Sequence, residues 1–386
     1  MNRQIKIGFL TTTDPNDKRS WSGIHFAMLN ELKKRYEQII VFGPLDGGNA
    51  LKMGKIRNRL SHRILKKRYD YSHSVSLSKK YAAQVMEKIN RYQPDLLIAP
   101  SGSSIIAHLP ASIPVILLSD TTLANMVDYY PAYSNLSLNS KNQSLETETF
   151  AIQKSAFAVF PSEWARSSAI KDHGGKAEKM KLIPFGPNFS NGPTREMALA
   201  EKKNDVLKLL FLGVDWHRKG GDLVMESFRL LQKKNIPVHL TIVGCNPPFS
   251  EEKHIRIIPF INKNDAAGEQ QIIQLLLESH VLFLPSKAEC YGIVFVEAAA
   301  CGTPSLARNT GGISGAVIQN ENGILLPESA TAKEYADQLE YWYHHPSEYR
   351  QIQEKSRMLF EKSHNWSHWG DAMEQLIRLS LEKGNS

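Results

Sequence analysis

Short apolar runs alternate along this chain with longer segments of mixed polarity, and this alternation constrains the fold more than any other feature. In the first half, the runs cover residues 5–10, 39–42, 96–99, 115–118 and 156–160. Apolar runs of this length fit buried strands, and the longer segments fit the helices that connect parallel strands. The first half is therefore predicted to be an α/β domain built on a parallel sheet.

The second half repeats this organisation and predicts a second Rossmann-like unit. Its expected strands are 207–212, 239–243 and 281–284, and its expected helices are 221–233, 265–279 and 293–300. Between the halves, residues 186–205 are rich in proline, asparagine, glycine and charge, as domain linkers often are. The predicted boundaries are 1–190 for the first domain, 191–206 for the linker, 207–362 for the second domain and 363–386 for a C-terminal helix.

The composition, 42% hydrophobic and 22% charged, is that of an ordinary globular protein. The chain has three cysteines, Cys245, Cys290 and Cys301, which are too few and too scattered for a disulfide framework or a zinc site. The first apolar run is shorter than the core of a signal peptide, and no apolar stretch reaches the ~20 residues of a membrane span. A cytoplasmic location is expected.

The net charge of +8 fits nucleic acid, an anionic membrane surface or phosphorylated substrates. No nucleic-acid motif and no basic groove interleaved with aromatic residues occurs, so no nucleic-acid partner is expected. Eight lysines and arginines cluster in residues 52–68, where Met53, Ile56, Leu60 and Ile64 share one helical face. Such a segment is either a helix for peripheral contact with an anionic membrane or a helix docked on its own domain.

Residues 286–304 carry the most chemical information, with the pattern of a strand end, a loop, a helix and a stop. A helix that begins at Gly292 and Ile293 presents backbone N–H groups suited to a diphosphate. Glu289 in the loop and Glu297 in the helix flank those groups, and carboxylates accept hydrogen bonds from sugar and ribose hydroxyls. This segment is therefore predicted to bind a sugar nucleotide.

On these residues the chain resembles the retaining GT-B glycosyltransferases that carry an E-x(7)-E motif, the group 1 or family 4-like enzymes. Sucrose-phosphate synthases and bacterial mannosyltransferases belong to this class. Further matching positions lie in the same order along the whole chain: Gly23, 160–162, 183–186, 219–220, 285–286 and 311–312. The resemblance implies two Rossmann-like domains that face each other across a cleft, with the acceptor in the first and the nucleotide sugar in the second. It also implies that the final helix crosses back to the first domain.

The resemblance assigns donor-binding roles in the second domain. Glu297 would hold the donor ribose and Glu289 a hydroxyl of the transferred sugar. The backbone amides around Tyr291, Gly292 and Ile293 would receive phosphate or sugar oxygens.

The resemblance also places the diphosphate beside Gly213, which ends the first strand of the second domain. Family members usually carry an arginine directly after this glycine, but here Val214 follows. Lys219 matches the family's diphosphate lysine. Arg218 is a candidate for the missing cation, because a departing diphosphate needs compensating charge.

In the first domain, Gly23 resembles the glycine that lets a helix N-terminus approach the sugar and the acceptor. His25 follows it and is a weaker acceptor candidate. Ser119, Asp120 and Thr121 come directly after a predicted strand, where ligands of α/β sheets bind. Asp120 either binds sugar or acceptor hydroxyls, or caps a helix.

The predicted function is retaining transfer of a sugar from a nucleotide-diphosphate donor, of UDP or GDP type, to a hydroxyl of a glycan or lipid-linked acceptor in bacterial glycan, glycolipid or polysaccharide synthesis. The resemblance implies a front-face substitution in which the leaving phosphate assists the hydroxyl, so no metal or other cofactor is expected. A nucleotide-sugar epimerase or a glycan phosphorylase shares the architecture and is the alternative. The glutamate motif argues against the epimerase, and a phosphorylase is a longer chain with a pyridoxal-phosphate lysine. A non-enzymatic basic binding protein is the least favoured reading.

Overall fold

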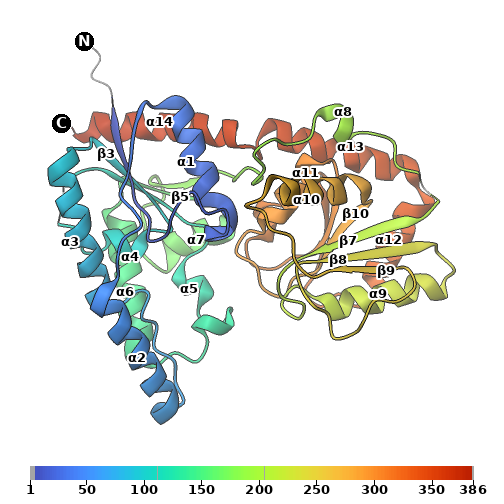
Figure 1. Ribbon diagram of the computed structural model, residues 1–386, viewed down its shortest axis with the longest axis horizontal. Coiled ribbons are helices and arrows are strands. Elements are labelled where there is room, and N and C mark those ends of the chain that lie inside the picture. The colour runs from blue at the N-terminus through green and yellow to red at the C-terminus, as the bar shows by residue number, and fades with distance from the viewer. Residues whose placement is uncertain (1–4, 111, 204, 385–386) are drawn as a thin grey trace. The chain divides into compact units, whose positions relative to one another are not determined.

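The computed structural model describes residues 5–110, 112–203 and 205–384 (Figure 1). The chain divides into two compact units, one made of Met1–Ile183 with Trp369–Ser386 and the other of Pro184–His368. Each unit holds one sheet of six parallel strands connected by helices. The predicted fold class, α/β with two Rossmann-like domains, is confirmed.

The first sheet has the strand order β2-β1-β3-β4-β5-β6, and all its neighbouring strands run parallel. Its strands are β1 (Lys6–Phe9), β2 (Gln38–Val41), β3 (Leu96–Pro100), β4 (Val115–Leu118), β5 (Phe157–Phe160) and β6 (Met180–Leu182). The helices of this unit are α1 (Ile24–Arg35), α2 (Gly48–Leu65), α3 (Val75–Tyr92), α4 (Ser103–Ile106), α5 (Leu123–Met126), α6 (Leu138–Lys154), α7 (Glu163–Lys171) and, from Trp369 on, α14 (Trp366–Gly384); short 3-10 helices cover Ser20–Gly23 and Pro131–Tyr133. Every residue of β3, β4 and β5 is buried, as expected for strands covered on both faces.

The second sheet has the order β12-β11-β10-β7-β8-β9 and is also parallel throughout. Its strands are β7 (Leu207–Leu212), β8 (Val238–Val243), β9 (Ile255–Ile258), β10 (Val281–Leu284), β11 (Ser305–Arg308) and β12 (Gly323–Leu326). The helices of this unit are α8 (Arg195–Ala198), α9 (Gly221–Lys233), α10 (Ala266–Glu278), α11 (Ile293–Ala300), α12 (Ala332–His344) and α13 (Pro346–Lys362), with a 3-10 helix at Ile313–Gly315.

The unit boundary falls between Ile183 and Pro184, so residues 184–190, which were predicted in the first domain, are counted with the second unit. Four parts of the predicted ranges lie outside the described residues: 1–4 and 111 of the first domain, 204 of the linker, and 385–386 of the C-terminal helix. Within the described part of the chain, no helix is both long enough and apolar enough to cross a membrane.

The basic segment predicted at residues 52–68 forms most of α2, which extends away from the sheet of the first unit (Figure 1). The helix packs against Tyr71 through its buried Gly54, where an added Cβ would lie 2.6 Å from the Tyr71 Cβ. Its apolar residues lie on another side and are exposed: Met53 by 62%, Ile56 by 44%, Leu60 by 52% and Ile64 by 72%. The alternative that these four residues pack inward is therefore wrong.

Candidate functional site

Strand order in the second sheet reverses between two neighbouring strands, β7 and β10. The chain builds β8 and β9 on one side of β7, then returns to add β10, β11 and β12 on the other. Ligands of open parallel sheets bind outside the strand C-termini at such a switch point. The loops after these two strands, residues 213–220 and 285–292, meet there, since the Lys287 N–H donates to the Arg218 carbonyl oxygen at 2.7 Å.

Lys219 and Glu289 form an ion pair at this switch point. The Lys219 Nζ donates to the Glu289 Oε2, and both side chains are largely buried. Arg218 lies beside them, with its Nη1 3.7 Å from the Glu289 Oε2 and donating to the Ala288 carbonyl oxygen at 3.0 Å. The two predicted diphosphate cations thus sit next to the predicted sugar-binding carboxylate.

Two glycines make this close approach possible. Gly220 has a φ of 79°, and a Cβ there would lie 2.3 Å from the Pro285 carbonyl oxygen of the facing loop. Gly213 follows β7, and a Cβ there would lie 2.9 Å from the Lys219 Cγ. A larger residue at Gly220 would push the two loops apart, and one at Gly213 would displace the Lys219 side chain within its own loop.

The helix α11 begins where the sequence predicts, with Gly292 at its N-cap in the left-handed region at a φ of 82°. The first N–H groups of a helix have no i−4 partner within it, which directs the amides of Ile293 and Val294 to this end, whereas the Phe295 N–H donates to the Gly292 carbonyl oxygen at 2.9 Å. The Tyr291 side chain is buried and donates to the Phe185 carbonyl oxygen at 3.4 Å. Its burial strongly raises the pKa of the phenol, so Tyr291 can serve the site through its backbone alone.

Glu297 lies further along α11 and has no exposed surface. Both of its carboxylate oxygens accept hydrogen bonds from the Lys263 Nζ, at 2.9 and 3.0 Å. Lys263 belongs to the loop between β9 and α10, and sequence reasoning missed it. No spacing or composition in that loop marks the residue, since the contact joins positions 34 residues apart.

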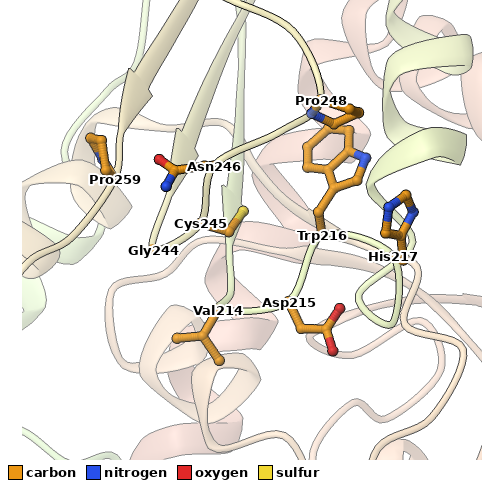
Figure 2. Close-up of a pocket in the computed structure, with 9 residues that line it drawn as sticks. All are labelled: Val214, Asp215, Trp216, His217, Gly244, Cys245, Asn246, Pro248 and Pro259. Carbon is orange, nitrogen blue, oxygen red and sulfur yellow. The ribbon is translucent and has the colours of Figure 1, made fainter.

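A pocket of about 520 Å³ opens at the C-terminal ends of β7, β8 and β9 (Figure 2). It is lined by Val214, Asp215, Trp216, His217, Gly244, Cys245, Asn246, Pro248 and Pro259. The Trp216 Nε1 donates to Asp222 at 2.8 Å, and the hydrogen bond from His217 to the other Asp222 oxygen is the main cause of the lowered pKa of that carboxyl group. This pocket was not predicted from the sequence. The glycine at position 244, directly after an expected strand, was the feature that could have indicated a ligand site there.

In the first unit, strand order reverses between β1 and β3, and the predicted residues of this unit follow β1 and β4. Gly23 is the N-cap of α1 at a φ of 92°. His25 is buried and its Nδ1 lies 2.9 Å from the Ser20 Oγ. Burial lowers the pKa of His25 to about 4, so the ring is neutral at pH 7.

Asp120 is tied to the loop before α1, because its Oδ2 accepts from the Trp21 Nε1 at 3.2 Å. It does not cap a helix, since the N-cap of α5 is Thr122, whose side chain accepts from the Asn125 N–H. Ser119 instead closes its own turn by donating from Oγ to the Thr121 carbonyl oxygen at 2.7 Å. Asp120 and His25 are thus held in neighbouring loops of one unit, whereas Ser119 and Thr121 shape the turn around Asp120.

Comparison with known sequences matches the chain to a family model and to curated relatives. Residues 194–359 match the family model of the glycosyl transferases group 1. A D-inositol 3-phosphate glycosyltransferase from Paenarthrobacter aurescens is 26% identical over 192 residues, which is 45% of each chain, and one from Streptomyces bingchenggensis is 46% identical over 188 residues, or 44% of this chain and 41% of that protein. The chain thus matches somewhat less than half the length of these curated relatives.

Solved structures are similar over more of the chain. Sucrose-phosphate synthase from Thermosynechococcus elongatus superposes with a TM-score of 0.60 at 20% identity over 78% of both chains. Anabaena Alr3699/HepE in complex with UDP superposes with a TM-score of 0.66 at 15% identity over 97% of this chain and 100% of that one. These likenesses show the fold, which is that of the GT-B glycosyltransferases.

Proposed function

We propose that this protein transfers a sugar, with retention of configuration, from a nucleotide-diphosphate sugar to a hydroxyl acceptor. The match of residues 194–359 to the family model of the glycosyl transferases group 1 supports the proposal. The observation that carries the proposal is the meeting of Lys219, Arg218 and Glu289 at the switch point of the second sheet. This group combines two cations for a departing diphosphate with one carboxylate for a sugar hydroxyl.

The donor would extend along the N-terminal half of α11. The diphosphate would lie at the helix N-terminus, next to Lys219 and Arg218, and the ribose at Glu297. The transferred sugar would place a hydroxyl on Glu289, so that Lys219 would be shared between the carboxylate and the phosphate. Alr3699/HepE, a protein of the same fold, has been solved with UDP and with UDP-glucose, which supports a nucleotide-sugar donor here.

In the proposed reaction the bond from the anomeric carbon to the diphosphate breaks, and the acceptor oxygen forms a bond on the same face of the sugar. The acceptor proton goes to the departing phosphate. The protein contributes position and compensating charge, and needs no side chain as a base. We place this activity in the cytoplasm, in bacterial glycan, glycolipid or polysaccharide synthesis, and the free cysteines, two of them buried, fit a reducing compartment.

The proposal includes peripheral contact of α2 with an anionic membrane, which would bring the enzyme to a lipid-linked acceptor. The exposed apolar stripe of α2 is flanked by the eight exposed cations of residues 52–68. Among the described residues, no carboxylate lies within ion-pair distance of these cations. A helix with apolar side chains beside cations that no carboxylate neutralises has the chemistry of an interfacial helix.

The donor assignment is tested by calorimetry with UDP, GDP and their sugars, followed by transfer assays with the sugar that binds. Glu289→Ala should keep affinity for the free nucleoside diphosphate and lose transfer, whereas Glu297→Ala should weaken nucleotide binding itself. An NMR spectrum of the product gives the anomeric configuration. Binding of none of these compounds, or an inverted product, would contradict the proposal.

A further inference from the structure

Glu297 carries a carboxylate with no exposed surface, and a buried carboxylate is stable only when it is paired. Within the described residues, Lys263 is the cation that pairs with it, through one hydrogen bond to each oxygen. The Lys263 side chain keeps 29% of its surface exposed, so its ammonium reaches Glu297 from the solvent side. The ion pair therefore lies at the boundary between the interior of the unit and its surface.

The loop that carries Lys263, residues 259–264, runs from the pocket to α10. Pro259 lines the pocket at the end of β9. At the other end, Asp265 caps α10 by accepting from the Ala267 N–H at 3.1 Å, and a Cβ on Gly268 would lie 2.1 Å from the Asn262 carbonyl oxygen. Lys263 thus links the rim of the pocket to the helix that carries Glu297.

We propose that Lys263 is a positioning residue for the donor, an inference that rests on the proposed contact between Glu297 and the donor ribose. The two hydrogen bonds fix the rotation of the Glu297 carboxylate. Each carboxylate oxygen has a second lone pair that can accept from a ribose hydroxyl. Because the carboxylate has no exposed surface in the free protein, the ribose reaches it only when the side chains over it shift aside. Lys263 keeps the carboxylate oriented, and recognition of the ribose hydroxyls depends on this orientation.

The experiment combines a change in the protein with a change in the ligand. Calorimetry gives the dissociation constants of UDP, 2′-deoxy-UDP, GDP and 2′-deoxy-GDP for the wild type, Lys263→Met and Lys263→Arg. Wild type should bind the ribonucleotide it accepts about 10-fold more tightly than the deoxy form, since a hydrogen bond to a charged group is lost. Lys263→Met should bind both forms with nearly equal affinity, and Lys263→Arg should restore most of the preference.

Lys234→Met is the matched control. Lys234 also pairs with two carboxylate oxygens in the same unit, those of Asp337 and Glu340, but on α12. This variant should keep the full preference for the ribonucleotide. Thermal unfolding reports whether each variant is folded, and Lys263→Gln, which removes the charge and keeps a donor, replaces Lys263→Met if the latter does not fold.

Three results would overturn the inference, and each contradicts a different part of the proposals above. A folded Lys263→Met or Lys263→Gln variant with the wild-type preference shows that the ion pair does not act on the ribose. A wild type that binds nucleotide but does not distinguish the deoxy form removes the ribose role of Glu297 as well. A wild type that binds none of the four nucleotides removes the proposed function itself.

Discussion

Lys219 and Arg218 both lie beside Glu289, and we expect them to contribute differently to transfer. Lys219 makes the direct contact with the carboxylate, whereas Arg218 is 3.7 Å away and also bonds a backbone carbonyl. Lys219→Met should lower kcat by roughly 10²–10³-fold, the cost of removing one charge-stabilising group. Arg218→Met should cost less, and the exposed Lys233→Met on α9 should leave transfer unchanged. Wild-type rates in both site variants would place the diphosphate elsewhere.

His25 makes the stability of the protein depend on pH. Burial lowers its pKa to about 4 in the folded state, while an unfolded histidine has a pKa near 6.5. Below about pH 6.5 the unfolded chain therefore binds a proton that the folded one does not, so stability falls as the pH drops from about 6.5 to 4, by at most about 3 kcal/mol.

Urea unfolding at a series of pH values measures this effect. His25→Leu should reduce the dependence of the unfolding free energy on pH without removing it, because burial also lowers the pKa of His280 to about 4. His62→Leu, which removes an exposed histidine of α2, is the control and should keep the wild-type slope. An unchanged slope in His25→Leu would show that the ring does not remain neutral in the folded state.

Single residues also show where sequence reasoning reaches its limit. Lys219 was predicted from the family resemblance, and Glu289 from its place in the loop before a helix N-terminus. The strand order brings the two side chains together. Lys263 could not be predicted, because its contact with Glu297 depends on the path of a loop with no pattern of its own. The roles of all these residues in transfer remain predictions.

At the scale of elements, β4, β7, β10, α9 and α11 begin and end at the predicted residues. β4 and β10 are uninterrupted apolar runs, β7 is apolar except for the exposed Lys208, and a glycine is the N-cap of each helix. The sequence did not reveal β6, β9, β11 or β12. β6 has three residues, Arg256 interrupts the apolar pattern of β9, and β11 has a polar residue at each end, Ser305 and Arg308. Pairing with a neighbouring strand therefore decides the structure of these segments more than composition does.

The helix α2 gives a test of membrane contact. Co-sedimentation with vesicles of anionic lipid should show binding at low salt that weakens at high salt, because each cation near the surface contributes roughly 1 kcal/mol. Neutralising Arg59, Arg63, Lys66 and Lys67 should abolish the binding. Changing Leu60 and Ile64 to serine should weaken the binding but leave its salt dependence unchanged. If the protein does not bind anionic vesicles at low salt, the membrane proposal is wrong.

At the scale of the whole molecule, the first unit is built from two distant parts of the chain. Trp369, Met373 and Ile377 of α14 have no exposed surface, and Arg35 of α1 pairs with Asp371 and Glu374. A fragment of residues 1–183 should therefore aggregate or unfold at a lower temperature than the same fragment joined by a flexible linker to residues 366–386. Circular dichroism on heating compares the two, and equal melting temperatures would show that α14 is dispensable for this unit.

The same feature sets an order of events during protein synthesis. A ribosome makes the sheet of the first unit early, but the helix segment that completes the unit leaves the exit tunnel only after residues 184–368 have been translated. The apolar surface that α14 covers therefore stays exposed to solvent until the last residues are made. The second unit is continuous in sequence and can complete its folding before the first. Such a chain is exposed to chaperones and to premature aggregation for longer than its length alone would require.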